Sequence, residues 1–233
     1  MLNAQTVNGS EFIHEHTVEV ADFTRVNLEG KIDVFYTQSE NNSITIMTMH
    51  SQHINNVYHN IRNNTLTIRN GGRRRFGITR MLFGENKNTT KIQVFIESPS
   101  IERFSKSGSG AITFLDSVSL DQLNFHVSGI SNINIPYLDV NDLEIRSSGF
   151  SRANIAGNAE NVRVSSSGSY NLNLENLVST KVRVSISGSG TVNVHSTDEL
   201  NVSSSGSGRV NYRGNPSMNV SVSGSGRVRR IVD

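Results

Sequence analysis

Hydrophobic and polar residues alternate in the second half of the chain around a Ser-Gly pair that recurs every 18 to 21 residues. Apolar residues stand four and six positions before each glycine, and again four and six positions after it, with Glu102 and Arg230 as exceptions. Such alternation predicts two short strands per turn, each with one buried face. The segment that joins one turn to the next varies from five to eight residues. The pattern therefore predicts an all-β parallel solenoid, with variation confined to one edge.

Two polar columns accompany the repeat. Glycine tolerates corner conformations that a Cβ would penalise, and the serine before it is expected to form a ladder of hydroxyls along the stack. The residue five positions after the glycine faces outward and is mostly asparagine; its interpretations are a sugar-binding strip or, preferred here, stacked structural amides. The expected ladder residues are Ser107, Ser128, Ser148, Ser167, Ser187, Ser205, Ser223, Asn134, Asn154, Asn173, Asn193 and Asn211.

Residues 17–98 carry a less regular version of the same pattern. A degenerate turn with Gly30 at its corner is followed by strands at 44–46, 66–68 and 92–96, and Asn63-Asn64 is typical of a tight turn. We expect one β-helix domain over 17–233, irregular over 17–98 and regular over 99–233. Residues 1–16 are expected to be a tail, either the remnant of a signal-peptide end or an ordinary polar terminus.

A basic segment at 70–88 interrupts the strand pattern. It contains Arg73, Arg74, Arg75 and Arg80 together with Phe83. Long insertions in compact domains are often functional, so these residues are the candidate contact for a partner, an anionic glycan or a membrane surface. The alternative, which we favour, is a solvated insertion whose apolar residues fold back on the solenoid.

The composition limits the kinds of functional site that the chain can carry. The net charge is +2 and there is no cysteine, which excludes disulfides and thiolate sites. No stretch approaches the roughly 20 apolar residues of a membrane span. Acidic residues occur singly and mostly in the variable segments, whereas glycoside hydrolysis needs a pair at a set separation. The histidine pairs His14/His16 and His50/His53 resemble no closed metal site. We therefore expect no catalytic site, metal, cofactor or nucleic-acid partner.

The repeat resembles a known family. Segments such as 128–135 and 187–194 combine a Ser-Gly corner with an apolar-Asn-apolar triplet, and the opening at 20–34 is similar too. These motifs resemble the putative auto-transporter adhesin head GIN domain, a domain of unknown function common in Bacteroidetes, over about residues 17–228. The resemblance implies a right-handed parallel β-helix, export to the cell envelope or beyond, and an adhesin role. It supplies no catalytic residues.

Three functional hypotheses follow. The first is a non-catalytic exported module for adhesion or scaffolding, with a glycan or a cell-surface protein as its partner. The second is a carbohydrate-active enzyme that uses a groove beside the variable segments. The third is a structural protein of the envelope that docks a protein partner through the solenoid ends or the basic segment. The sequence favours the first, and it leaves the oligomeric state open.

Overall fold

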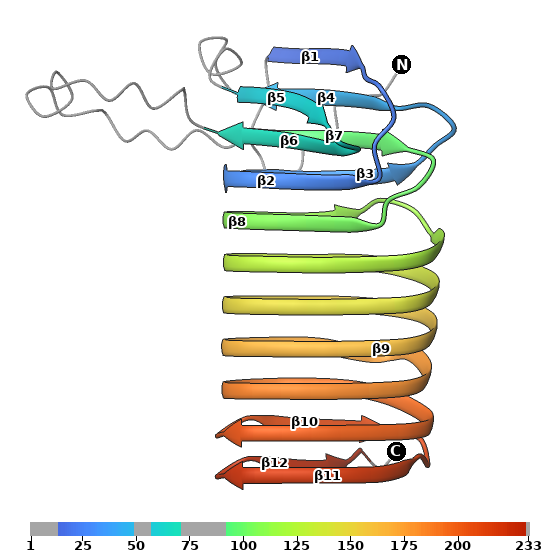
Figure 1. Cartoon of the computed structure of the whole chain (residues 1–233), viewed down its shortest axis with the longest axis vertical. Coiled ribbons are helices and arrows are strands. Elements are labelled where there is room, and N and C mark those ends of the chain that lie inside the picture. Colours follow the sequence, from blue (N-terminus) through green and yellow to red (C-terminus); the bar gives the residue numbers. More distant parts are fainter. Residues whose placement is uncertain (1–13, 49–56, 71–91, 232–233) are drawn as a thin grey trace, which may run out of the picture.

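The computed structural model describes residues 14–48, 57–70 and 92–231, and all regular elements within them are β-strands. The strands belong to one 12-stranded sheet. Figure 1 shows a stack of rungs with a front and a back layer, and the chain passes from layer to layer at both edges. The all-β class expected from the sequence is confirmed.

The Ser-Gly array forms the lower part of this stack. It comprises β8 (Arg103–Phe114), β9 (Val118–Gly206), β10 (Arg209–Arg213), β11 (Ser217–Gly224) and β12 (Arg227–Arg230). Every pairing between these strands is parallel, and the register sets each corner glycine beside the next, as in Gly108–Gly129 and Gly206–Gly224. The front layer carries the residues before each corner glycine and the back layer those after it (Figure 1).

The core is a continuous apolar column between the two layers. The positions expected to face inward are buried in β8 and β9, as in Phe104, Phe125 and Val184, each with no exposed surface, and in β10 Val210 is buried and Tyr212 half-buried. At the upper end of the array, the rings of Phe104 and Phe125 stack with centroids 5.8 Å apart, and Tyr36 and Phe114 join them. Burial of this column is the main stabilising contribution to a stack whose single turns have no core of their own.

The front half extends both layers of the stack upward. Sheet order is β1-β4-β7-β3-β8-β2-β6-β5, so β8 joins a back stack to a front stack. The strands are β1 (His14–Glu19), β2 (Arg25–Lys31), β3 (Asp33–Gln38), β4 (Ser43–Thr48), β5 (Val57–Arg62), β6 (Thr65–Asn70) and β7 (Ile92–Ser98). β2 and β3 pair in parallel with β8, and Gly30 lies opposite Gly108. The predicted corner at Gly30 and the predicted strands are therefore confirmed.

The front half contains antiparallel pairs as well as parallel ones. β4 pairs antiparallel with β7, β1 with β4, and β5 with β6. The physical reason is clearest in the β5–β6 hairpin, where Asn63 and Asn64 take φ values of 50° and 60°. A two-residue turn of this kind reverses the chain, and only antiparallel strands can be joined so closely.

The two ends of the stack differ from the sequence expectations. At the N-terminal end, β1 begins at His14, three residues before the expected domain start at 17. At the C-terminal end, all eight residues of β11 are exposed, including the core-facing Met218, Val220 and Val222 at 39–43%. The last described turn, in which Arg230 breaks the apolar pattern, therefore leaves its apolar side chains uncovered.

Candidate functional site: the serine groove and the corner patch

The corner glycines form a column that fixes how closely the turns approach. All eight, from Gly30 to Gly224, have φ between +90° and +112°. A Cβ on Gly168 would lie 2.5 Å from the carbonyl oxygen of Gly149, and the same overlap recurs along the column. Both the backbone conformation and the close approach therefore require glycine here.

The corner serines stand in register on the outside of this column. Ser107 lies opposite Ser128, and Ser205 opposite Ser223, and all seven are exposed. A hydroxyl–hydroxyl hydrogen bond between turns does occur, but one position earlier and inside the stack, between Ser147 and Ser166 at 2.7 Å. A hydrogen-bonded ladder of the corner serines themselves stays a prediction.

The asparagine column lies on the back face. Asn154 donates to Asn134 at 3.4 Å, Asn173 donates to Asn154 at 3.2 Å, and Asn211 donates to Asn193 at 2.8 Å. These side chains therefore satisfy one another across neighbouring turns. Their amides are engaged in the stack, which supports the structural interpretation of this column.

The interior of the corner is partly polar. The Lys106 ammonium is buried and donates to the Ile32 carbonyl at 2.7 Å; burial lowers the pKa of Lys106 to about 8, and Asp33 opposes that shift. Tyr170 lies over the inward-facing glycines of later turns, because a Cβ on Gly190 or Gly208 would collide with it. The second glycine of the later Ser-Gly-Ser-Gly corners therefore makes room for this ring.

A groove of about 450 Å³ runs along the front face, which we call the serine groove. Its lining comes largely from positions one and three before the corner glycine in five successive turns, from His126 and Ser128 down to Ser203 and Ser205. Because each turn contributes the same positions, the groove crosses the strands and follows the axis of the stack. Serine hydroxyls dominate the lining, and it contains no carboxylate.

The two upper turns of the groove carry four larger side chains, which we call the corner patch. His126 and Arg146 belong to the groove lining, and Ile130 and Phe150 directly follow the corner glycines of the same two turns. Ile130 is 56% exposed and Phe150 is 38% exposed, and the Arg152 guanidinium carbon lies 4.8 Å from the centre of the Phe150 ring. The patch therefore places apolar surface and cationic groups beside a groove made of hydroxyls.

An ion pair and a shifted histidine define the electrostatics of the corner patch. Glu144 accepts from Nε and Nη2 of Arg146 at 2.9 and 2.8 Å. Burial and the guanidiniums of Arg103 and Arg146 hold the pKa of His126 below its usual value, although Glu144 acts in the opposite direction. His126 is therefore neutral at pH 7, and Arg146 keeps three further donors after its pair with Glu144.

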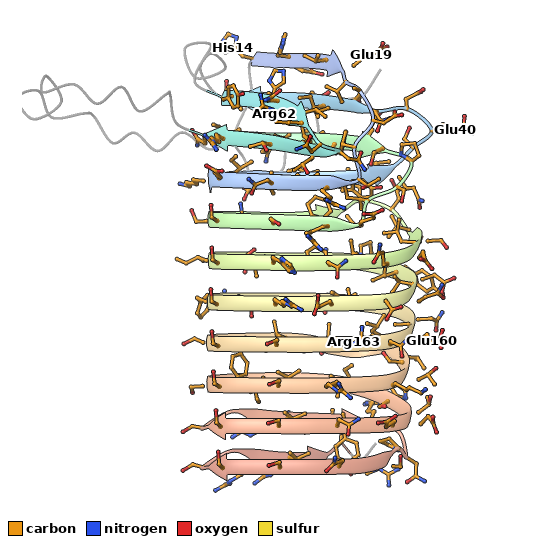
Figure 2. The ribbon with its side chains drawn as sticks, viewed as in Figure 1. His14, Glu19, Glu40, Arg62, Glu160 and Arg163 are labelled. Atoms are coloured by element: carbon orange, nitrogen blue, oxygen red, sulfur yellow. The ribbon has the colours of Figure 1, made fainter. Side chains whose placement is uncertain are left out.

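Two more arginines flank the groove, five positions before the corner glycine. Arg163 donates to Asp142 at 3.3 Å, while Arg183, in the next turn, has no ion pair with the described residues. Figure 2 labels Arg163 on the front face and Glu160 at the edge where the turns are joined. Arginines thus accompany the groove through three consecutive turns, from Arg146 to Arg183, and two of the three are paired with carboxylates.

The sequence-predicted candidates fall elsewhere. Arg73, Arg74, Arg75, Arg80 and Phe83 lie outside the described residues, as do His50 and His53. His14 and His16 lie on β1, and the described ranges hold no group of three or more residues suited to a metal ion. Sequence reasoning missed the corner patch, although a signal was present: serine is replaced in two columns of the same two turns.

Comparison with known proteins identifies the family of the chain. A family model described as "Putative auto-transporter adhesin, head GIN domain" matches residues 22–216. The chain belongs to this family. The predicted resemblance is therefore confirmed, and membership in a family named for adhesins supports a binding role at a surface. Comparison with curated protein sequences gives no match. The described residues form no helix that could cross a membrane.

Several solved structures share the fold at low identity. A putative adhesin from Bacteroides fragilis is 22% identical, with a TM-score of 0.81 over 96% of this chain and 98% of that chain. One from Parabacteroides merdae is 22% identical, with a TM-score of 0.70 over 97% and 98%. A protein from Parabacteroides distasonis titled a putative lipid binding protein is 16% identical, with a TM-score of 0.67 over 94% and 96%. At these identities the likeness establishes the fold alone.

Proposed function

We propose that this head GIN protein is a non-catalytic, exported module of the cell envelope that binds a surface ligand through its front face. The stack is then a rigid scaffold, which we take to be a right-handed parallel β-helix acting as one domain over 17–233. The observation that carries the proposal is the serine groove, which crosses five turns and offers exposed hydroxyls beside apolar and cationic side chains. Membership in a family named for adhesins also supports a binding function.

The groove favours binding over hydrolysis. A glycosidase needs two carboxyl groups on opposite sides of the scissile bond, but the groove lining contains none, and the neighbouring Glu144 is engaged by two donors of Arg146. The glycines and inward-facing residues that shape the groove are fixed by the stack. A surface made this way changes little when a ligand arrives, which keeps the entropic cost of binding low.

Adhesion can be tested with beads coated with the full chain. We expect saturable attachment to immobilised polysaccharides or to cell surfaces, competition by the free chain, and no release of reducing ends from the polysaccharides. Attachment no greater than that of albumin-coated beads would contradict binding, and reducing-end release would favour the enzyme hypothesis. Antibody labelling of intact cells of the source organism tests export, since a cytoplasmic protein would stay unlabelled.

The basic segment remains a separate candidate contact. Changing Arg73, Arg74 and Arg75 to alanine tests it in the same bead assay. If attachment is lost in this variant but kept when residues of the serine groove are changed, the partner binds the basic segment instead of the groove.

A further inference from the structure

Two serine columns of the front corner are interrupted at the same place. Three positions before the corner glycine the residues are Ser105, His126, Arg146, Ser165, Ser185, Ser203 and Ser221, and one position after it they are Ser109, Ile130, Phe150, Ser169, Ser189, Ser207 and Ser225. Five turns have serine at both positions. The two turns with Gly129 and Gly149 have it at neither.

The larger residues are not required by the fold. Five turns of the same stack form with serine at these positions, so serine satisfies the local backbone. Ile130 and Phe150 leave 56% and 38% of their surfaces exposed, which is apolar area that contributes little to the core. Exposed apolar area that borders a polar groove is a mark of a binding surface.

The spacing of the groove selects the kind of ligand. Its repeating unit is the distance between strands, about 4.8 Å, whereas an extended peptide advances about 3.4 Å per residue and falls out of step within two turns. A linear polysaccharide joined through opposite ring positions advances by nearly one strand spacing per sugar. Its rings would then keep step with the turns, with alternate rings turned over, and the apolar face of a ring suits a contact with Phe150 or Ile130.

The arginines beside the groove favour an acidic polymer. Arg146, Arg163 and Arg183 stand in successive turns. Glu144 pairs with Arg146 and Asp142 pairs with Arg163, but both guanidiniums are more than half exposed and keep further donors for a ligand. Arg183 has no ion pair with the described residues, and Arg146 is 60% exposed. Guanidinium groups bind carboxylates with two parallel hydrogen bonds, so a polymer with an acidic group on each sugar can pair with these arginines.

We propose that the serine groove and the corner patch bind a linear acidic polysaccharide, with one sugar per turn and its carboxylates at Arg146, Arg163 and Arg183. This assignment rests on the proposed binding function and adds the ligand class and its position. It predicts that binding requires both the sugar chain and its acidic groups.

Calorimetry on the full chain tests the proposal with three probes. They are a β-1,4-linked mannuronate hexamer, the neutral mannohexaose of the same linkage, and poly-glutamate as a polyanion without sugar rings. We expect the mannuronate hexamer to bind at least tenfold more tightly than either of the others, with an affinity that falls as salt is added. No binding of the hexamer, or equal binding of mannohexaose or poly-glutamate, would overturn the proposal.

A variant that restores the repeat tests the position. The restored variant carries serine at four positions, as the other five turns do: His126→Ser, Ile130→Ser, Arg146→Ser and Phe150→Ser. Its urea midpoint should not fall, because the other turns fold with serine there. We expect at least tenfold weaker binding of the mannuronate hexamer. Arg183→Ser alone, at an exposed position without an ion pair, should weaken it about threefold to tenfold.

The matched control is Tyr137→Ser with Arg229→Ser, which also removes an exposed ring and a guanidinium, but outside the groove and the patch. Its affinity should equal that of the unchanged chain. If both the restored variant and Arg183→Ser bind the hexamer with full affinity, the ligand does not bind at the serine groove and the corner patch. If coated beads adhere to surfaces while the hexamer does not bind, the ligand assignment fails and the adhesive function stands; if neither occurs, both fail.

Discussion

Replacing Gly168 with alanine should be among the most damaging single methyl additions in this protein. Gly168 stands in the middle of the corner column at φ +96°, and a Cβ there would lie 2.5 Å from the carbonyl oxygen of Gly149 and 3.1 Å from its nitrogen. The atoms that it meets are backbone, which cannot swing aside as a side chain could. The substitution therefore acts on the spacing between turns.

Its magnitude has two parts. Holding alanine at this φ costs about 1–3 kcal/mol. Relief of the overlap requires the two turns to separate, because real Cβ contacts stay beyond 3.0 Å. Separation lengthens hydrogen bonds of the kind that joins Ser207 N to the Gly188 oxygen at 2.9 Å, each worth about 1 kcal/mol. Strain and two weakened bonds together destabilise the fold by about 3–5 kcal/mol.

Urea unfolding followed by far-ultraviolet circular dichroism measures this loss. With a slope of about 3 kcal/mol per molar urea, the midpoint should fall by about 1 M or more. Ser167→Ala is the matched control, because its exposed side chain lies one residue away, and it should stay within about 0.5 kcal/mol of the unchanged chain. Equal midpoints for Gly168→Ala and Ser167→Ala would refute the argument that the glycine column sets the approach of the turns.

Three further predictions concern the interior and the end of the stack. The folded pKa of Lys106, about 8, lies below its unfolded value of about 10.4, so the free energy of unfolding should rise as pH increases from 8 to 10. Lys106→Met should abolish that rise and stabilise the fold at pH 7 by about 2 kcal/mol, and urea midpoints measured at pH 7, 8 and 10 test both effects. Tyr170→Phe should be neutral or slightly stabilising because the buried hydroxyl has no hydrogen-bond partner among the described residues, whereas Tyr170→Ala should cost about 3–5 kcal/mol in the same assay; a larger loss for phenylalanine would contradict this. Amides of β11 should exchange with deuterium faster than those of the β9 turns, since β11 is exposed and pairs only with β9; stronger protection in β11 would indicate a cap.

The repeated part of the fold was predictable because its constraints are local and recur. Period-two alternation around Gly149 or Gly188 identifies both strands, and the constant spacing between them fixes the parallel register. Asn63-Asn64 likewise predicts the tight turn of the β5–β6 hairpin. The pairing of β4 with β7 was not predictable, because nothing in residues 43–48 distinguishes a parallel from an antiparallel neighbour.

The candidate site was harder to predict because the most conspicuous residues of the sequence are those that repeat. Repetition of serine and asparagine marks what the stack tolerates or needs, as the bonds between Asn154 and Asn173 illustrate. A ligand site appears instead where the repeat is broken on an exposed face, at Ile130 and Phe150. Their exposure depends on the layer in which they lie, and this became clear only when both layers were placed.

The most direct test is a crystal structure of the chain with the β-1,4-linked mannuronate hexamer. The account predicts the sugar in the serine groove, crossing the strands at one ring per turn, with carboxylates at Arg146, Arg163 and Arg183. A hexamer that lies along a strand, at the edge where the turns are joined near Glu160, or against the exposed β11 would contradict it.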